Sequence, residues 1–130
     1  YREYVGVDVA TMSANPRPPM YGAYHHVTIL DRDGNPKQGG EEMVDVVGPL
    51  CENNDKFAVQ RRLPKTDIGD IMVQHDTGAH SPAMGGNYNG WMRPQELLLR
   101  SDGSVERTRR AEMMDDLFAT LDFDPDILPA

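Results

Sequence analysis

The feature that most constrains the fold of this chain is a series of short segments in which apolar and polar residues alternate. Alternation with a period of two residues is typical of half-buried β-strands. We therefore predict strands at Glu3–Val9, His25–Leu30, Met43–Gly48, Phe57–Leu63, Asp70–His75, Glu96–Arg100 and Ser104–Arg110.

The residues between these segments favour tight turns. Asp33-Gly34 lies between the second and third predicted strands, and Asp102-Gly103 lies between the last two. Asp-Gly is a strong hairpin signal because both residues tolerate a positive φ. Seven short strands, with frequent Gly and Pro between them, predict a mainly β fold that is an antiparallel barrel or sandwich.

One segment, Ala111–Leu121, has the periodicity of a helix, because its apolar residues recur at the i, i+3, i+4 spacing of one helical face. The tail Asp122–Ala130 contains two prolines and three aspartates, and we predict coil there.

Composition limits the class of protein. The 130 residues suit one domain with a modest core. The net charge of -8 argues against nucleic acid or an anionic membrane as partner, because phosphate neutralisation needs clustered Lys and Arg. No apolar run approaches the roughly 20 residues of a membrane-spanning helix. A single cysteine, Cys51, favours a reducing compartment.

Two longer segments lack strand periodicity and are expected to be ordered loops with a binding role. Thr11–Tyr24 contains three prolines, and Thr77–Pro94 contains four glycines and the only tryptophan. In the first of them, Arg17 and Tyr21 are four residues apart, with prolines that restrict the backbone between them. A guanidinium and a phenol suit a carboxylate or phosphate ligand, although a surface arginine and a packing tyrosine would give the same pattern.

Cys51 and Glu52 follow Gly48-Pro49, which ends a predicted strand. A neutral thiol donates a proton at pH 7, and a neighbouring carboxylate binds an ammonium group. From the residues alone, a small buried cysteine beside a solvated glutamate is the commoner explanation of this pattern, because free cysteines are often core residues. His25 and His26 are adjacent and would point to opposite faces of a strand, so we predict no metal site.

Five blocks in order resemble one known domain. They are 17–25 (RPPMYGAYH), 46–55 (VVGPLCENND), 69–70 (GD), 78–80 (GAH) and 87–96 (NYNGWMRPQE). Together they resemble the C-terminal β-barrel domain of diaminopimelate decarboxylases, which use pyridoxal 5'-phosphate and share their fold with eukaryotic ornithine decarboxylase and alanine racemase.

The resemblance implies that residues 1–130 form a single C-terminal domain of a longer decarboxylase, a Greek-key-like antiparallel barrel with one short C-terminal helix. An N-terminal (β/α)₈ barrel outside this chain would hold the cofactor and its Schiff-base lysine. The resemblance also implies a homodimer with an active site shared between subunits, in the bacterial cytoplasm, and a fragment that is inactive alone.

The resemblance assigns roles to individual residues. Arg17 and Tyr21 match residues that bind the distal carboxylate of diaminopimelate, and Glu52 matches the carboxylate that binds its distal ammonium. Cys51 matches the catalytic cysteine that crosses the dimer interface and returns a proton after carbon dioxide leaves. Asp55 would brace that loop.

One position departs from the family pattern. His80 stands where the family usually has a tyrosine that touches cofactor and substrate, so we expect His80 to be a substrate- and cofactor-binding residue. The first functional hypothesis is conversion of meso-diaminopimelate to L-lysine and carbon dioxide. The alternatives are a decarboxylase for carboxynorspermidine or ornithine, and a non-catalytic homologue that acts as a binding partner.

Overall fold

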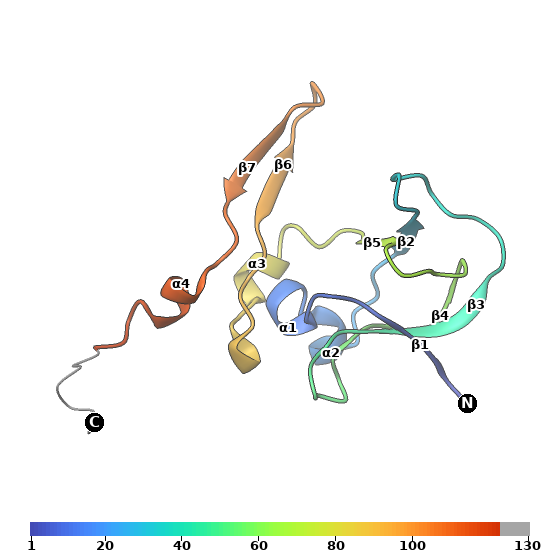
Figure 1. Ribbon diagram of the computed structural model, residues 1–130, viewed down its shortest axis with the longest axis horizontal. Helices are drawn as coiled ribbons and strands as arrows, with labels where there is room; N and C mark the ends of the chain where they lie inside the picture. Colours follow the sequence, from blue (N-terminus) through green and yellow to red (C-terminus); the bar gives the residue numbers. More distant parts are fainter. Residues whose placement is uncertain (123–130) are drawn as a thin grey trace. The chain divides into compact units, whose positions relative to one another are not determined.

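All seven predicted strands are present in the computed structural model, which describes residues 1–122 (Figure 1). They are β1 (Glu3–Gly6), β2 (Val27–Leu30), β3 (Glu42–Val47), β4 (Lys56–Leu63), β5 (Ile71–Gln74), β6 (Glu96–Leu99) and β7 (Val105–Arg109). The mainly β class predicted from the alternating pattern is confirmed.

The chain divides between Trp91 and Met92 into two compact units. The first contains a three-stranded sheet of order β1-β3-β4 and a two-stranded sheet of β2 and β5. The second contains the antiparallel pair of β6 and β7. The prediction that the whole chain is one domain stays a prediction.

The strand pairing differs from the predicted antiparallel barrel. Residues 1–122 form no closed barrel, and β1 runs parallel to β3. The hairpin turn at Asp33-Gly34 does form, with Gly34 at a φ of 85° and an antiparallel bridge between Leu30 and Pro36. The expected pairing of β2 with β3 is wrong, because β2 pairs with β5. Turn chemistry is local, whereas the partner of a strand depends on which distant segment buries its apolar face. The hairpin predicted at Asp102-Gly103 is confirmed.

The two segments predicted as loops contain short helices. The first holds α1 (Thr11–Ala14) and α2 (Arg17–Tyr21), and the second holds α3 (Ser81–Met84) and the 3₁₀ turn η1 (Tyr88–Gly90). Proline in the first turn of α2 and of α3 is compatible with a helix, because the first amides of a helix have no intrahelical acceptor.

The predicted C-terminal helix is present but shorter, as α4 (Met114–Phe118). The coil predicted for the tail lies, from residue 123 onward, outside the described residues. Within residues 1–122, no helix has both the length and the apolar character needed to cross a membrane.

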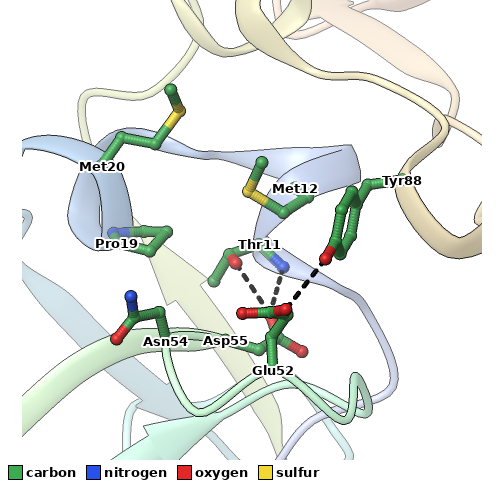
Figure 2. Close-up of a pocket in the computed structure, with 8 residues that line it drawn as sticks. All are labelled: Thr11, Met12, Pro19, Met20, Glu52, Asn54, Asp55 and Tyr88. Atoms are coloured by element: carbon green, nitrogen blue, oxygen red, sulfur yellow. Dashed lines mark hydrogen bonds between the residues drawn. The ribbon is translucent and has the colours of Figure 1, made fainter.

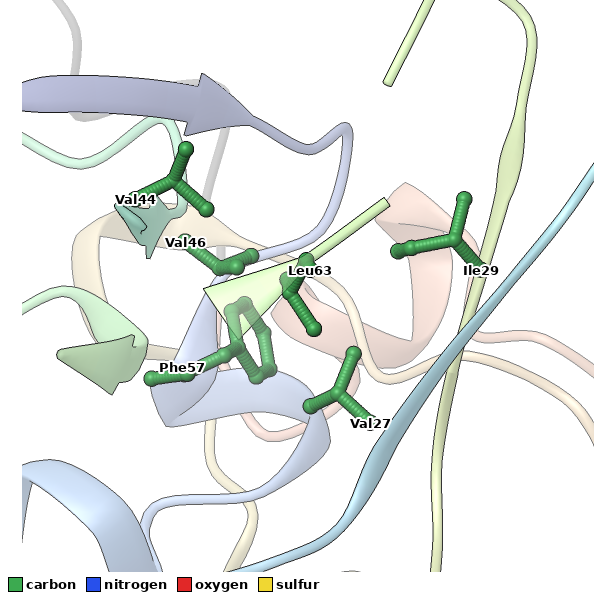
Figure 3. Close-up of a cluster of buried hydrophobic side chains, with 7 residues drawn as sticks. Val27, Ile29, Val44, Val46, Phe57 and Leu63 are labelled. Atoms are coloured by element: carbon green, nitrogen blue, oxygen red, sulfur yellow. The ribbon is translucent and has the colours of Figure 1, made fainter. Parts of the chain in front are cut away.

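The core of the first unit lies between its two sheets (Figure 3). Side chains from three strands converge there, and they are Val27, Ile29, Val44, Val46, Phe57, Ala58 and Leu63. The alternation of Val27 with Ile29 and of Val44 with Val46 places each pair on one face of its strand. Burial of each large aliphatic side chain contributes about 2 kcal/mol.

A buried aspartate, Asp45, lies on the face of β3 opposite to that of the core residues Val44 and Val46. The side chain of Asp45 is 2% exposed, and its carboxylate accepts the Gln60 amide at 2.8 Å and Nη1 of Arg2 at 3.1 Å, with Nζ of Lys56 at 3.7 Å. Gln60 has a φ of 48° and lies where the β3–β4 register shifts. Asp45 thus fixes an irregularity in the hairpin that leads into the β3–β4 loop.

The second unit is held mainly by polar contacts. The Arg93 guanidinium binds the Glu112 carboxylate at 2.5 and 2.6 Å, and Arg110 binds Asp116 at the start of α4 at 2.5 and 2.7 Å. Arg110 and the amide of Met113 hold the pKa of Asp116 well below its usual range. No residue between 92 and 122 is fully buried.

We expect Asp45→Ala to lower the free energy of unfolding by about 2 kcal/mol, because the Gln60 amide loses its acceptor and two cations lose their counter-charge. Urea unfolding of the protein that contains this chain, at pH 7, measures the loss. An unchanged midpoint would show that the irregularity does not depend on this carboxylate.

The same residue predicts a pH dependence. Burial alone would raise the pKa of Asp45, but the Gln60 amide and the charges of Arg2 and Lys56 outweigh burial and hold it below its usual value. The ionised form therefore stabilises the fold above the unfolded-state pKa, about 4, and the contribution is lost as pH falls through the folded-state value. We expect the stability difference between wild type and Asp45→Asn to shrink below about pH 4.

Candidate active site

The candidate site is built on the loop between β3 and β4, which carries Cys51 and Glu52. Asp55, at the end of this loop, is 3% exposed. Its Oδ1 accepts the backbone amide and the hydroxyl of Thr11 at 2.8 and 2.7 Å, and its Oδ2 accepts the amide of Leu50 at 2.8 Å. One carboxylate thus ties the loop to the first residue of α1, and the bracing role expected of Asp55 is confirmed.

The backbone at the start of the loop leaves room for this carboxylate. The Gly48 amide donates to the Asp55 carbonyl at 2.9 Å. A Cβ atom at Gly48 would lie 2.2 Å from Oδ2 of Asp55, far inside van der Waals contact. Glycine is required here because Asp55 approaches the Gly48 backbone so closely.

A pocket of about 220 Å³ lies beside the loop (Figure 2). Its lining residues come from α1, α2, the β3–β4 loop and η1, and they are Thr11, Met12, Pro19, Met20, Glu52, Asn54, Asp55 and Tyr88. They include two carboxylates and no basic side chain. The Asp55 carboxylate is already occupied by its three donors, so Glu52 is the acidic group available to a ligand. The pocket therefore suits an ammonium group better than an anion.

The η1 turn contacts both residues of the Cys-Glu pair. The Tyr88 hydroxyl donates to Oε1 of Glu52 at 2.9 Å, and Nδ2 of Asn89 donates to Sγ of Cys51 at 3.7 Å. The hydrogen bond to Glu52, together with its negative charge, raises the pKa of Tyr88 above its usual value. The phenol therefore remains a donor at neutral pH.

The structure brings some of the predicted site residues together and leaves others apart. Glu52 lines the pocket, and Cys51 precedes it on the exposed loop. Arg17 and Tyr21 are the first and last residues of α2, whose middle supplies Pro19 and Met20 to the pocket wall, but neither Arg17 nor Tyr21 lines the pocket itself.

His80 is exposed at the N-cap of α3 and also lies outside the pocket lining. The segment that follows it is joined to α1 by the Gly86 amide, which donates to the Met12 carbonyl at 2.9 Å. No group of three His, Cys, Asp or Glu side chains within residues 1–122 is arranged to hold a metal ion.

Tyr88 and Asn89 are the site residues that sequence reasoning misses. They belong to the block 87–96, which marks the resemblance without indicating what either side chain touches. Their partners lie 36 and 38 residues earlier in the chain. The local signal is the pair Asn89-Gly90, since both residues have a positive φ.

We expect Asp55→Asn to destabilise the protein by about 2 kcal/mol, because an amide offers only one acceptor atom and would place its NH₂ against the donors of Thr11 or Leu50. Gly48→Ala should destabilise it similarly by displacing the same carboxylate. Urea unfolding measures both, and Asn53→Ala, in the same loop, is the control. If Gly48→Ala leaves stability unchanged, the close approach of Asp55 is not required.

Comparison with known proteins gives the family. Residues 2–78, more than half of the chain, match the family described as "Pyridoxal-dependent decarboxylase, C-terminal sheet domain". The chain is 54% identical to Protein TabA of Pseudomonas amygdali pv. tabaci over 95% of this chain and 28% of that protein. It is 40% identical to the diaminopimelate decarboxylase of Methanothermobacter thermautotrophicus over 90% of this chain and 26% of that protein.

A solved structure agrees. The crystal structure of diaminopimelate decarboxylase from M. jannaschii in co-complex with L-lysine matches with a TM-score of 0.81 and 34% identity, over 96% of this chain and 27% of that one. The chain thus spans about a quarter of the length of its relatives. It belongs to the pyridoxal-dependent decarboxylases, as a C-terminal sheet domain of that family.

Proposed function

We propose that this chain supplies substrate-binding residues and the proton donor of a decarboxylase that converts meso-diaminopimelate to L-lysine and carbon dioxide. The observation that carries the proposal is the Cys51-Glu52 pair, which a buried carboxylate holds at the edge of an acidic pocket. The names of several relatives, and the L-lysine in the M. jannaschii complex, support the substrate.

Glu52 would bind the distal ammonium of the substrate. Within the described residues its Oε2 has no hydrogen-bond partner, while Oε1 accepts from Tyr88. Arg17 and Tyr21, from the helix that forms part of the pocket wall, would bind the distal carboxylate. The Glu52 carboxylate would accept the ammonium, and the Arg17 guanidinium would bind the carboxylate. Together they select a substrate with an amino acid group at its far end.

Cys51 would hold the proton that replaces the departing carboxyl group. The C–C bond breaks with its electron pair left on the substrate carbon, and the S–H proton moves to that carbon. The resulting thiolate regains a proton from water. A thiol on a loop that the Asp55 carboxylate fixes is suited to this step, because the proton must be delivered from a fixed position.

The pocket does not fit pyridoxal 5'-phosphate by itself. The cofactor supplies the electron sink for decarboxylation, but its phosphate needs amide or basic donors and its aldehyde needs a lysine. Lys37 is engaged by Asp67 and Asp70, and Lys56 lies beside Asp45. We infer that the cofactor is held chiefly by the N-terminal barrel of the longer protein, with His80 as the contact from this chain.

We propose that segments of the full-length protein outside this chain complete the sheets. Leu97, Leu99 and Val105 of the β6–β7 hairpin are each more than half exposed. Such apolar surface favours burial against the rest of the protein or a second subunit. On this basis we propose a closed barrel in the full-length protein and a homodimer with a shared active site. The proposed place in the bacterial cytoplasm rests on the resemblance to the family.

A second candidate function is decarboxylation of a different amino acid. The chain is more similar to Protein TabA, whose name gives no substrate, than to the M. thermautotrophicus enzyme, and it has His80 where the family usually has a tyrosine. The structural likeness to carboxynorspermidine decarboxylase, at 15% identity, concerns the fold alone.

Carbon dioxide release from the full-length protein, loaded with pyridoxal 5'-phosphate, tests the substrate. We expect meso-diaminopimelate to be preferred over ornithine and carboxynorspermidine, because only it presents both an ammonium and a carboxylate to Glu52 and Arg17. Preference for another substrate would favour the second candidate function. It would also indicate that His80, in place of the usual tyrosine, changes the substrate specificity. Release from none of them would favour the non-catalytic homologue.

Two substitutions separate the proposed roles. Cys51→Ala should lower kcat by about 100-fold or more and leave KM and cofactor absorbance close to wild type, since it removes only the proton donor. Arg17→Ala should chiefly raise KM, by about tenfold or more, through loss of a charged contact. Steady-state kinetics measure both. An unchanged kcat in the first variant, or an unchanged KM in the second, would contradict the role concerned.

A further inference from the structure

Two neighbouring residues of η1 contact two neighbouring residues of the β3–β4 loop. Tyr88 binds Glu52, and Asn89 binds Cys51, so the two pairs of residues run in opposite order along the chain. We call this four-residue contact the clasp. The Tyr88–Glu52 hydrogen bond is drawn in Figure 2, where the phenol points from η1 toward the carboxylate.

The turn that carries the clasp is held by its own hydrogen bonds. The Gly90 amide donates to the Asn87 carbonyl at 2.9 Å, and the Asn87 side-chain amide donates to the Trp91 carbonyl at 3.1 Å. Asn89 has a φ of 56°, a conformation in which asparagine is one of the better-tolerated residues. Its side chain therefore starts from a fixed backbone.

The β3–β4 loop is equally fixed. The Asp55 carboxylate binds the amide of Leu50, which directly precedes the Cys-Glu pair, and it also binds Thr11 of α1. Cys51 and Glu52 themselves are exposed and make no other side-chain hydrogen bond among the described residues. Without the clasp, both side chains would be free to change rotamer. With it, each keeps one contact that fixes its direction.

We propose that Tyr88 and Asn89 are positioning residues for the proposed reaction, Tyr88 for substrate binding and Asn89 for proton delivery. This inference rests on the proposed function. Tyr88 occupies Oε1 of Glu52 and so leaves Oε2 for the ammonium of the substrate. The Asn89 amide occupies an acceptor position on the Cys51 sulfur and leaves the S–H proton free to be donated elsewhere.

The assignment predicts that substitutions at these adjacent residues change different kinetic constants. In the full-length enzyme, Tyr88→Phe should raise KM for meso-diaminopimelate about tenfold with little change in kcat, because a hydrogen bond to a charged binding group is lost. Asn89→Gly should lower kcat about tenfold with little change in KM, because the proton donor is no longer fixed. Glycine tolerates the positive φ, so the turn itself is retained.

Matched controls come from the same unit. Tyr4→Phe changes a tyrosine that is 59% exposed on β1, and Asn53→Ala removes an exposed amide two residues after Cys51. Both should match wild type in kcat and KM. If both kinetic constants move together in Tyr88→Phe and in Asn89→Gly, the turn has only a structural role and the proposal is overturned.

A readout without turnover separates this proposal from the proposed function. An amide donor stabilises a thiolate, the species that iodoacetamide alkylates. Alkylation of Cys51 at fixed pH, followed by mass spectrometry of its peptide, should slow about threefold in Asn89→Gly and further in Asn89→Asp, where a carboxylate faces the sulfur. Asn53→Ala should react at the wild-type rate.

The outcomes are distinguishable. Slower alkylation in both Asn89 variants supports the clasp even if wild type releases no carbon dioxide from diaminopimelate, in which case only the substrate assignment fails. Alkylation at the wild-type rate in both variants overturns the role of Asn89, whatever the activity of the enzyme.

Discussion

The site depends on one buried carboxylate, that of Asp55. A carboxylate that is almost fully removed from water is unfavourable unless hydrogen bonds satisfy it, and Asp55 obtains three, from Thr11 and Leu50. The two bonds from Thr11 join segments 44 residues apart and fix where α1 meets the β3–β4 loop. Gly48 is part of the same requirement, because any side chain there would displace the carboxylate. The positions of Cys51 and Glu52 follow from this arrangement.

Two buried aspartates act at different points of the same hairpin. Asp45 sets the register shift within β3 and β4, and Asp55 sets the loop that connects them. Between them, Val46 and Ala58 are paired across the strands and both belong to the core. The hairpin is therefore fixed by apolar burial on one side and by satisfied carboxylates at two points. A loop built in this way can present polar groups to solvent without losing its conformation.

The period-two pattern is sufficient to locate every strand. In β2 the alternation follows from the burial of one strand face, whereas β6 and β7 bury neither face among the described residues. The pattern is insufficient for the pairing of β2 with β5, which depends on contacts between segments more than 40 residues apart. The four- and five-residue helices α1 and α2 are too short to show a helical period, and their prolines indicate a loop. Cys51 and Glu52 gain a specific role only through the resemblance, since a structural role is the commoner explanation of their residue types. The contacts of Tyr88 and Asn89 require the folded chain.

The exposure of the site has a physical consequence. Cys51 and Glu52 are held rigidly, yet both face solvent, and an ammonium bound to an exposed carboxylate is held weakly because water screens the charges. Strong substrate binding, as proposed for Glu52, requires a cover over the loop. The proton transfer proposed for Cys51 requires the same cover if water is to be excluded. This chain spans about a quarter of the length of its relatives, so ample protein exists in such enzymes to provide that cover. The clasp and the Asp55 bonds would then serve to preset the loop, so that docking against the covering surface costs little conformational entropy.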